Sequence, residues 1–456
     1  MMPASKLLGN AIALALTAAS TGTASAGQLD YTLYSGLLHS DNVSLSDTNP
    51  VSQNVLIPGV NFAYTQTGSS VQANAAGTLE YRDYLGNAFS NQTLAQLSSQ
   101  VNWTVMPKRL DFTVQDFAGV QPLSTFASNA PNNQQQTNVL TLGPTLHFRL
   151  GDTMQGQAEL RYINSDASKN KEFNSSRGEA ALRVFKDLSN NSQLSANFET
   201  QSVDFQQSSG PAFDLPGTTI VNPNYTRNEL FAHYVGTFTH FDLNSALGWS
   251  QIDFRGAPNV SSPLIRVAVN WLATPSNHFG ITAVRQYSDA AEDMILQQGG
   301  QTMFGTDAMQ TSALIAPLGI NTGNSVVDAE LYLDRHLEAT YSFNSERVSF
   351  SISPRYGHSD FLNNPVFNQS DRGGSGVFNF KLTPLTTIFA FGASDSITYR
   401  SIARRDKTSD YGIGLAQQRT PHWGWRVSLT HQLRTSTVPN NQYSENELYV
   451  GIVYKR

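Results

Sequence analysis

The sequence predicts an all-β fold: an up-and-down antiparallel β-barrel that crosses a membrane with about 20 strands, or about 18 if faint runs are discounted. Three observations predict it. Apolar and polar residues alternate along many runs, short turns alternate with long polar loops, and 39% of the 456 residues are hydrophobic while only 14% are charged. Successive side chains of a strand point to opposite faces, so each run has one apolar and one wet face.

The clearest hairpin spans residues 71–105. Its first run alternates apolar residues such as Tyr81 with polar residues such as Glu80, and after a polar loop at 85–91 the second run ends near Trp103. Each run is long enough for a tilted strand to cross a bilayer. A hairpin of a soluble sandwich or propeller alternates as well. The length of the runs favours the membrane, because globular strands usually have about five or six residues.

Polar or Gly/Pro-bearing breaks divide the chain into such runs, and short breaks alternate with long ones. The short breaks are Thr67–Ser70, Pro107–Arg109, Gly151-Asp152, Asp187–Asn191, Thr239–Asp242, Ala273–Asn277, Asn344–Glu346, Thr383–Thr386 and Gln418–His422. The long ones are Asp41–Gln53, Gly119–Asn138, Asn164–Ser175, Gln206–Tyr225, Arg255–Ser262, Ser288–Asn324, Ser359–Arg372, Ile402–Ser409 and Arg434–Asn446. Short periplasmic turns and long extracellular loops are typical of outer-membrane barrels.

The first residues predict export. Lys6 precedes an apolar stretch over 7–19, and Ala24-Ser25-Ala26 is a small-residue cleavage site. We therefore predict a cleaved signal peptide at 1–26, a single barrel domain at 27–456 and a place in the bacterial outer membrane. The chain has no Cys, so no disulfide supports the fold. A mean hydropathy of −0.30 argues against helical membrane spans but suits a barrel with one wet face.

The wet faces carry charges of both signs. The residues predicted to line the pore are Glu80, Arg82, Arg149, Glu159, Arg161, Glu179, Arg183, Glu199, Arg227, Glu229, Arg266, Arg355 and Arg426. Opposite charges on one wall form ion pairs that hold the strands together, and they also give the lumen a mixed-sign field for sugar hydroxyls and acidic groups. The sequence leaves open whether the charges only strengthen the wall or also select solutes.

Aromatic residues gather at one membrane interface. Trp103, Trp271 and Trp423 lie within a few residues of a short turn, and Trp425 and Tyr454 extend the set. Amphipathic rings prefer the headgroup level of a bilayer, so these five residues predict an aromatic belt. The run at 447–454 is the last strand and resembles the terminal segment by which outer-membrane barrels are recognised for insertion.

A barrel of this width encloses water or a plug. The segment Ser288–Asn324 is the candidate for a loop that folds inward, because Met294-Ile295-Leu296 and Ala313–Leu318 are too apolar for a solvated tip. Packing across neighbouring loops outside the barrel is the alternative. The sequence does not decide between them.

The sequence has no convincing catalytic or cofactor-binding motif, and we expect neither enzymatic activity nor a cofactor. Gly357-His358-Ser359-Asp360 is the one suggestive cluster, yet adjacent residues of a strand point to opposite faces, so His358 and Ser359 form no dyad. His336 shares a strand face with Asp334 and Glu338, but an extended row suits no tight metal site. No phosphate-binding glycine loop and no basic nucleic-acid footprint is present.

Two stretches carry a family resemblance. Ser40-Asp41-Asn42-Val43 and the run Gly77–Tyr84 (GTLEYRDY) resemble outer-membrane β-barrel porins that accompany surface-polysaccharide and PEP-CTERM (exosortase) systems. The resemblance implies a non-enzymatic channel or assembly partner, with polysaccharide or secretion-system components as partners beside outer-membrane lipid. That family supplies no active-site residue to look for.

We therefore expect a channel for small solutes or for surface polysaccharide. A non-conducting barrel that binds polysaccharide or an export partner through its long loops is the alternative. The oligomeric state is left open.

Overall fold

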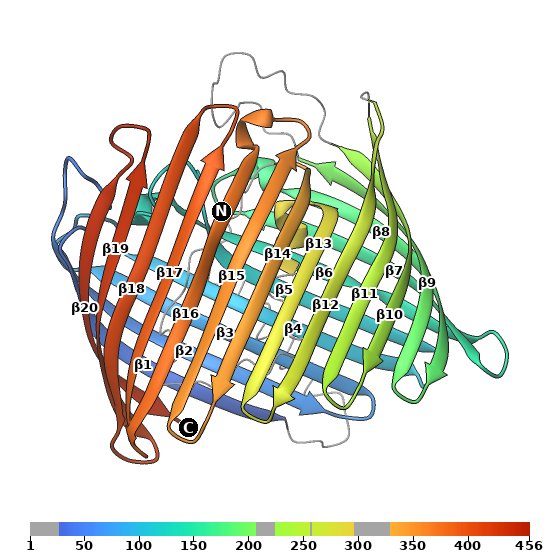
Figure 1. Ribbon diagram of the computed structural model, residues 1–456, viewed down its shortest axis with the longest axis horizontal. Coiled ribbons are helices and arrows are strands. Elements are labelled where there is room, and N and C mark those ends of the chain that lie inside the picture. Colours follow the sequence, from blue (N-terminus) through green and yellow to red (C-terminus); the bar gives the residue numbers. More distant parts are fainter. Residues whose placement is uncertain (1–26, 207–223, 256–257, 296–328) are drawn as a thin grey trace.

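The computed structural model describes residues 27–206, 224–255, 258–295 and 329–456. Within these ranges the chain forms one 20-stranded antiparallel sheet that closes on itself (Figure 1). The predicted signal peptide at 1–26 and residues 296–324 of the candidate inward loop lie outside the described residues.

The strands have 12 to 16 residues each. They are β1 Gln28–Ser40, β2 Gln53–Thr67, β3 Val71–Tyr84, β4 Gln92–Met106, β5 Leu110–Pro122, β6 Gln134–Arg149, β7 Met154–Ala167, β8 Ser175–Ser189, β9 Ser192–Phe205, β10 Tyr225–Thr237, β11 Phe241–Phe254, β12 Val260–Thr274, β13 Asn277–Ser288, β14 Tyr332–Asn344, β15 Val348–Phe361, β16 Gln369–Thr383, β17 Thr386–Tyr399, β18 Arg404–Gln418, β19 Trp423–Ser436 and β20 Tyr443–Lys455. Three short 3₁₀ turns, Pro131–Asn133, Lys171–Phe173 and Pro365–Phe367, lie in loops. A helix at 290–295 follows β13.

Each strand pairs with its neighbours in the chain, and β1 pairs with β20 to close the barrel. At the seam, Thr32–Ser40 of β1 run antiparallel to Glu447–Lys455 of β20. Closure leaves no open edge strand in the described part of the sheet, as a membrane interior requires. The predicted fold class is confirmed, with 20 strands rather than 18.

The predicted short breaks all fall where one strand meets the next, at the end of the barrel that we call the turn end. At the opposite, loop end the strands extend into most of the predicted long breaks, and two breaks differ most clearly. The break predicted at Gly119–Asn138 is shorter, because β5 runs to Pro122 and β6 begins at Gln134. The break predicted at Ile402–Ser409 mostly belongs to β18. Strand ends that leave the hydrocarbon carry polar residues on both faces, so the alternation is lost while backbone pairing continues.

The outward face of the wall is apolar. Leu230 is 64% exposed, Ile413 54% and Ile281 52%, and each alternates with residues that face the lumen. A closed barrel has no second layer to cover such side chains, so a lipid bilayer is the medium that suits them. Among the described residues, no helix is long and apolar enough to cross a membrane.

The residues predicted for the aromatic belt lie at the turn end. Trp103, Trp271 and Trp423 are about half exposed, at 51%, 50% and 49%. Trp423 meets Tyr454 edge-on, with ring centroids 5.0 Å apart. The belt also includes rings that the sequence prediction left out: Phe279 stacks on Trp271 at 5.3 Å and on Tyr341 at 4.7 Å.

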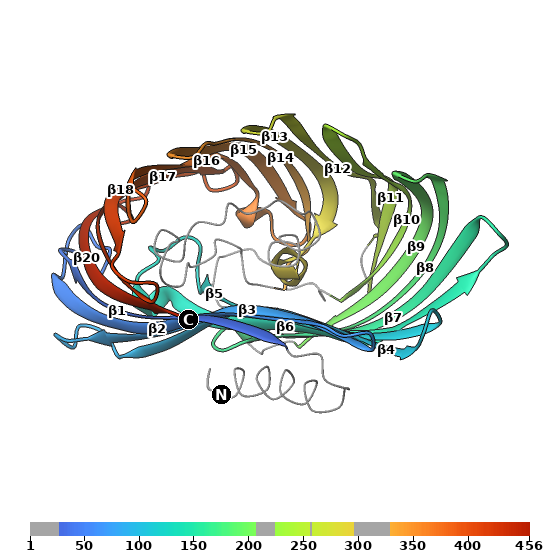
Figure 2. The same cartoon turned by 90° about the horizontal axis from the view of Figure 1, so that it is seen from below.

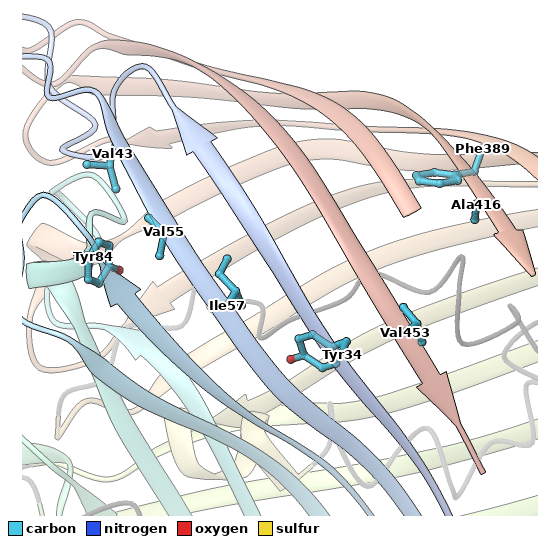
Figure 3. Packing of buried hydrophobic residues seen from close by; sticks show 8 residues of the cluster. All are labelled: Tyr34, Val43, Val55, Ile57, Tyr84, Phe389, Ala416 and Val453. Carbon is cyan, nitrogen blue, oxygen red and sulfur yellow. The ribbon is translucent and has the colours of Figure 1, made fainter. Parts of the chain in front are cut away.

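The inner face is not uniformly polar. Near the closing seam, apolar side chains of β1, β2, β3, β17, β18 and β20 form a buried cluster with a loop valine (Figure 3). Its members are Tyr34, Val43, Val55, Ile57, Tyr84, Phe389, Ala416 and Val453. The hydroxyl of Tyr34 points out of this cluster and donates a hydrogen bond of 3.0 Å to Glu80. One side of the lumen therefore has an apolar lining beside its charged wall.

Candidate pore constriction

The residues predicted to line the pore lie on the inward face, alternating with exposed apolar residues of the same strands. They are Glu80, Arg82, Arg149, Glu159, Arg161, Glu179, Arg183, Glu199, Arg227, Glu229, Arg266, Arg355 and Arg426.

Many of these charges form ion pairs along the wall. Arg183 of β8 bridges Glu159 of β7 at 3.0 Å and Glu199 of β9 at 2.7 Å. Within one strand, Arg161 lies 3.2 Å from Glu159. The ladder thus links three neighbouring strands, and such cross-strand pairs stabilise a sheet by about 0.2–1 kcal/mol each.

Other members of the set have different partners. Arg82 lies 2.6 Å from Glu80, and Arg355 lies 2.7 Å from Asp395. Arg426 places its guanidinium 4.5 Å from the ring centroid of Phe389. These contacts hold the guanidinium groups against the wall.

The chain after β13 crosses the lumen to the wall at β6 and β7, where it forms a short helix that we call the crossing helix. Residues 289–295 leave the loop end of β13 and turn inward, and the coil lies inside the ring of strands (Figure 2). Its apolar side packs Ala290, Ala291 and Met294 against Val139 of β6 and Ile163 of β7, far around the ring from β13. The inward alternative for the loop Ser288–Asn324 is therefore correct for its first residues.

The acidic side of this helix is held by buried arginines. Asp289 accepts two hydrogen bonds from Arg177 of β8, at 2.6 and 3.0 Å, and one of 2.7 Å from the hydroxyl of Tyr225. Glu292 forms an ion pair with Arg227 of β10. Arg177 and Asp289 are 3% and 1% exposed, so both charges depend on each other for solvation.

The pKa values of Asp289 and Glu292 are shifted in opposite directions. Burial opposes the ionisation of Asp289, but the positive charge of Arg177 outweighs this effect, so the pKa of Asp289 lies below its usual range. For Glu292, burial outweighs Arg227 and raises the pKa.

Asp293 fastens the helix to β14, the strand that pairs with β13. Its carboxylate accepts hydrogen bonds from Ser288, at 2.6 Å, and from the hydroxyl of Tyr332 of β14. Burial raises the pKa of Asp293 to about 7, and the charges of Asp334 and Glu292 add to the rise. The helix is thus tied to β8 and β10 by Asp289 and Glu292, and to β14 by Asp293.

A second segment reaches across the barrel from the loop between β5 and β6. The backbone carbonyl of Phe126 accepts a hydrogen bond from Arg404 of β18, and the carbonyl of Ala127 accepts one from Arg434 of β19, each 2.5 Å long. The ring of Phe126 stacks on Phe367 with centroids 5.5 Å apart. The two segments enter the lumen from different sides and narrow it together.

The sequence prediction missed this second segment. Arg404 and Arg434 converge on Asp406, at 2.8 Å each, and so point two guanidinium groups inward. Phe126, a lone ring in a polar stretch, was the available signal. It was too weak to indicate a partner some 280 residues away.

The cluster considered for catalysis takes a different arrangement. His358 contacts Asp360 at 2.8 Å and Ser370 of β16 at 2.8 Å, whereas Ser359 lies on the opposite face of β15. Asp360 is shared with Arg335 and so belongs to an ion-pair network. Within the described ranges, no group of three or more His, Asp or Glu side chains could hold a metal ion.

No protein-family model and no curated protein matches this chain. Solved outer-membrane barrels are similar to it. They include a mutant of the ferric enterobactin receptor PfeA of Pseudomonas aeruginosa, with 8% identity, a TM-score of 0.45 and coverage of 95% of this chain and 81% of that one. The FrpB iron transporter of Neisseria meningitidis has 10% identity, a TM-score of 0.44 and coverage of 94% and 81%. OccK2 (OpdF) of P. aeruginosa has 9% identity, a TM-score of 0.38 and coverage of 94% and 98%.

Proposed function

We propose that this chain is an outer-membrane channel for small polar solutes, with its loop end outside the cell. The observation that carries the proposal is a closed barrel whose outer face is apolar and whose inner face is lined by paired charges of both signs. A mixed-sign lining interacts with hydroxyls and with either ion type, without a strong charge preference. Passage of a surface polysaccharide, which the family resemblance implies, is the finer form of this proposal.

A non-conducting barrel that binds a partner through its loops is the second candidate. It is favoured by the two segments that cross the lumen, because each is fastened by ion pairs or hydrogen bonds to the far wall. Both candidates use the same fold. They differ in whether ions pass the constriction.

Conductance in planar lipid bilayers decides between them. We expect the purified barrel to conduct, and we expect a larger conductance from the double variant Asp289→Asn, Glu292→Gln, which loosens the crossing helix. The matched control is Asp152→Asn, which removes an exposed carboxylate at the turn end. If the native chain and the double variant both stayed closed to ions, the channel would be excluded in favour of the binding barrel.

A further inference from the structure

The outer face of β13 to β18 carries a row of basic side chains near the loop end. Arg285 pairs with Arg335, which pairs with His358, and the row continues through Ser370 and on to Arg405. These positions have the outward orientation of the exposed apolar residues in the same strands. These strand ends leave the hydrocarbon, so the row lies at the level of the lipid headgroups.

A second basic row lies one step closer to the turn end. Tyr356 pairs with Arg372, and the row leads on through Ser396 to Lys407. Arg400, in the adjacent loop, extends to the first row and donates a hydrogen bond of 3.0 Å to Ser370. We call the following residues the basic patch: Arg335, Arg372, Arg400, Arg405 and Lys407.

Positive charge dominates this patch. In β13 to β18 and the loops 362–368 and 400–403, Asp360 is the one acidic residue on the outward face, and it forms an ion pair with Arg335. The rest of the patch has no carboxylate partner in the described part of the chain. Arg372, Arg400, Arg405 and Lys407 are also exposed.

The far side of the barrel has the opposite sign. Of the strands that run toward the loop end, β3, β7, β9 and β11 each place an aspartate outward near that end. These are Asp83, Asp166, Asp204 and Asp253, of which Asp204 forms an ion pair with Arg255. The outer rim thus has an acidic arc and a basic arc. A polyanion is repelled by the acidic arc and attracted to the basic arc.

Side-chain contacts hold the patch in position. Ser370 and Asp360 both bind the ring of His358, which links Arg400 on one side to Arg335 on the other. Arg372 places its guanidinium 5.4 Å from the ring centroid of Tyr356. Groups that are already ordered lose little freedom on binding a ligand.

Apolar side chains lie beside the patch on its turn-end side. Leu337, Ile352, Tyr411 and Ile413 are 51%, 52%, 53% and 54% exposed on the outer face. A ligand that covers both surfaces has an anionic head toward the loop end and hydrocarbon chains below it.

We infer that the basic patch binds a phosphorylated lipid of the outer leaflet. Guanidinium groups bind phosphate oxygens through paired N–H donors, and several cations side by side match a headgroup with more than one phosphate. The apolar residues then receive the acyl chains. The inference rests on the proposed membrane location, but not on conduction.

The test measures lipid retained by the detergent-solubilised barrel in native mass spectrometry, with diphosphoryl lipid A as the probe. We expect the triple variant Arg372→Gln, Arg405→Gln, Lys407→Gln to retain it about a hundredfold more weakly. The matched control, Arg109→Gln, Arg347→Gln, Arg419→Gln, removes the same charge from exposed positions at the turn end and should retain the native affinity. Replacement of Arg372 and Arg405 by Lys should preserve most binding.

Two further arms identify the ligand chemistry. Lipid A without its phosphates should bind no better to the native chain than to the triple variant, and inorganic phosphate should not displace diphosphoryl lipid A. Equal retention by both triple variants, or full displacement by inorganic phosphate, would overturn the inference. Heat-shifted mobility in gels checks that each variant is folded. Conductance is recorded separately, so a closed but lipid-binding barrel refutes only the channel.

Discussion

Arg177 shows how one side chain controls the constriction. Its guanidinium is almost fully buried and binds both oxygens of Asp289, the residue that begins the crossing helix. A buried ion pair contributes little net stability, but removal of one partner leaves the other charge without solvation. Arg177 therefore keeps the helix in place because Asp289 is unfavourable without it.

Replacing Arg177 by Gln should release the helix from the wall, since leaving Asp289 unpaired costs roughly 3–5 kcal/mol. The chain has no Cys, so a single Ala291→Cys reports on docking. Ala291 is 1% exposed, and its thiol should react slowly with a maleimide. We expect labelling at least tenfold faster in the Arg177→Gln background.

The control is Arg149→Gln, which removes an exposed inward arginine at the turn end. It should leave the labelling rate of the Ala291→Cys chain unchanged. An equal rate in both backgrounds would mean that the ion pair does not hold the helix.

Asp293 makes docking depend on pH. Its pKa is about 7 when docked, compared with 3.8 for a free aspartate, so the docked state binds a proton more tightly. Its contribution to docking is full below about pH 4 and is lost as the pH rises to 7. Glu292, Asp334 and His336 are the charged groups that interact with Asp293.

The labelling rate of Ala291→Cys should therefore rise between pH 5 and pH 7.5 by more than thiol ionisation explains. The exposed control Ala88→Cys supplies that intrinsic rate. With Asp293→Asn the ratio of the two rates should become nearly flat. A ratio that keeps its slope in this variant would point to Glu292 instead, whose pKa is also raised.

At the scale of elements, the strands could be predicted and the two crossing segments could not. Alternation is a local pattern. With lipid on one face of the strand and water on the other, the faces of residues such as Leu160 and Glu159 can be predicted from their immediate neighbours in the sequence. The contacts of the crossing segments are not local, because Arg177 and Asp289 are 112 residues apart. The apolar residues of 294–296 indicated that the loop is covered, but not by which wall.

Phe126 anchors the second crossing segment. Its ring contacts Phe367 and Tyr399, at 5.5 and 4.9 Å, and Arg404 lies 5.2 Å from its centroid. Phe126→Ala removes these contacts and should weaken docking by about 1–3 kcal/mol. We expect a larger single-channel conductance in planar bilayers.

Leu85→Ala is the matched control, because Leu85 is 53% exposed in a neighbouring loop. It should leave the conductance unchanged. If Phe126→Ala conducts like the native chain, the segment does not limit the pore.

For the whole molecule, closure of the ring is the step on which every other feature depends. The seam pairs Gly36 of β1 with Gly451 of β20, and the ring of Tyr449 lies over both glycines on the inner face. A Cβ atom at either glycine would overlap this ring. The aromatic side chain therefore fills the space that two side chains would otherwise take, which stabilises a glycine pair within a sheet.

A double-mutant cycle tests this account of closure. Gly36→Val alone should destabilise the barrel by about 1–3 kcal/mol, because the valine displaces the ring of Tyr449. In the Tyr449→Ala background the same valine enters vacant space, so its cost should fall or change sign. The temperature at which the folded gel band converts to the unfolded band measures both effects.

The control is Gly178→Val, where a new Cβ meets nothing within 4 Å. This valine should change the stability of the barrel by the same amount with and without Tyr449. Contacting residues couple by roughly 0.5–3 kcal/mol, so additive effects at Gly36 would show that the ring does not support the seam.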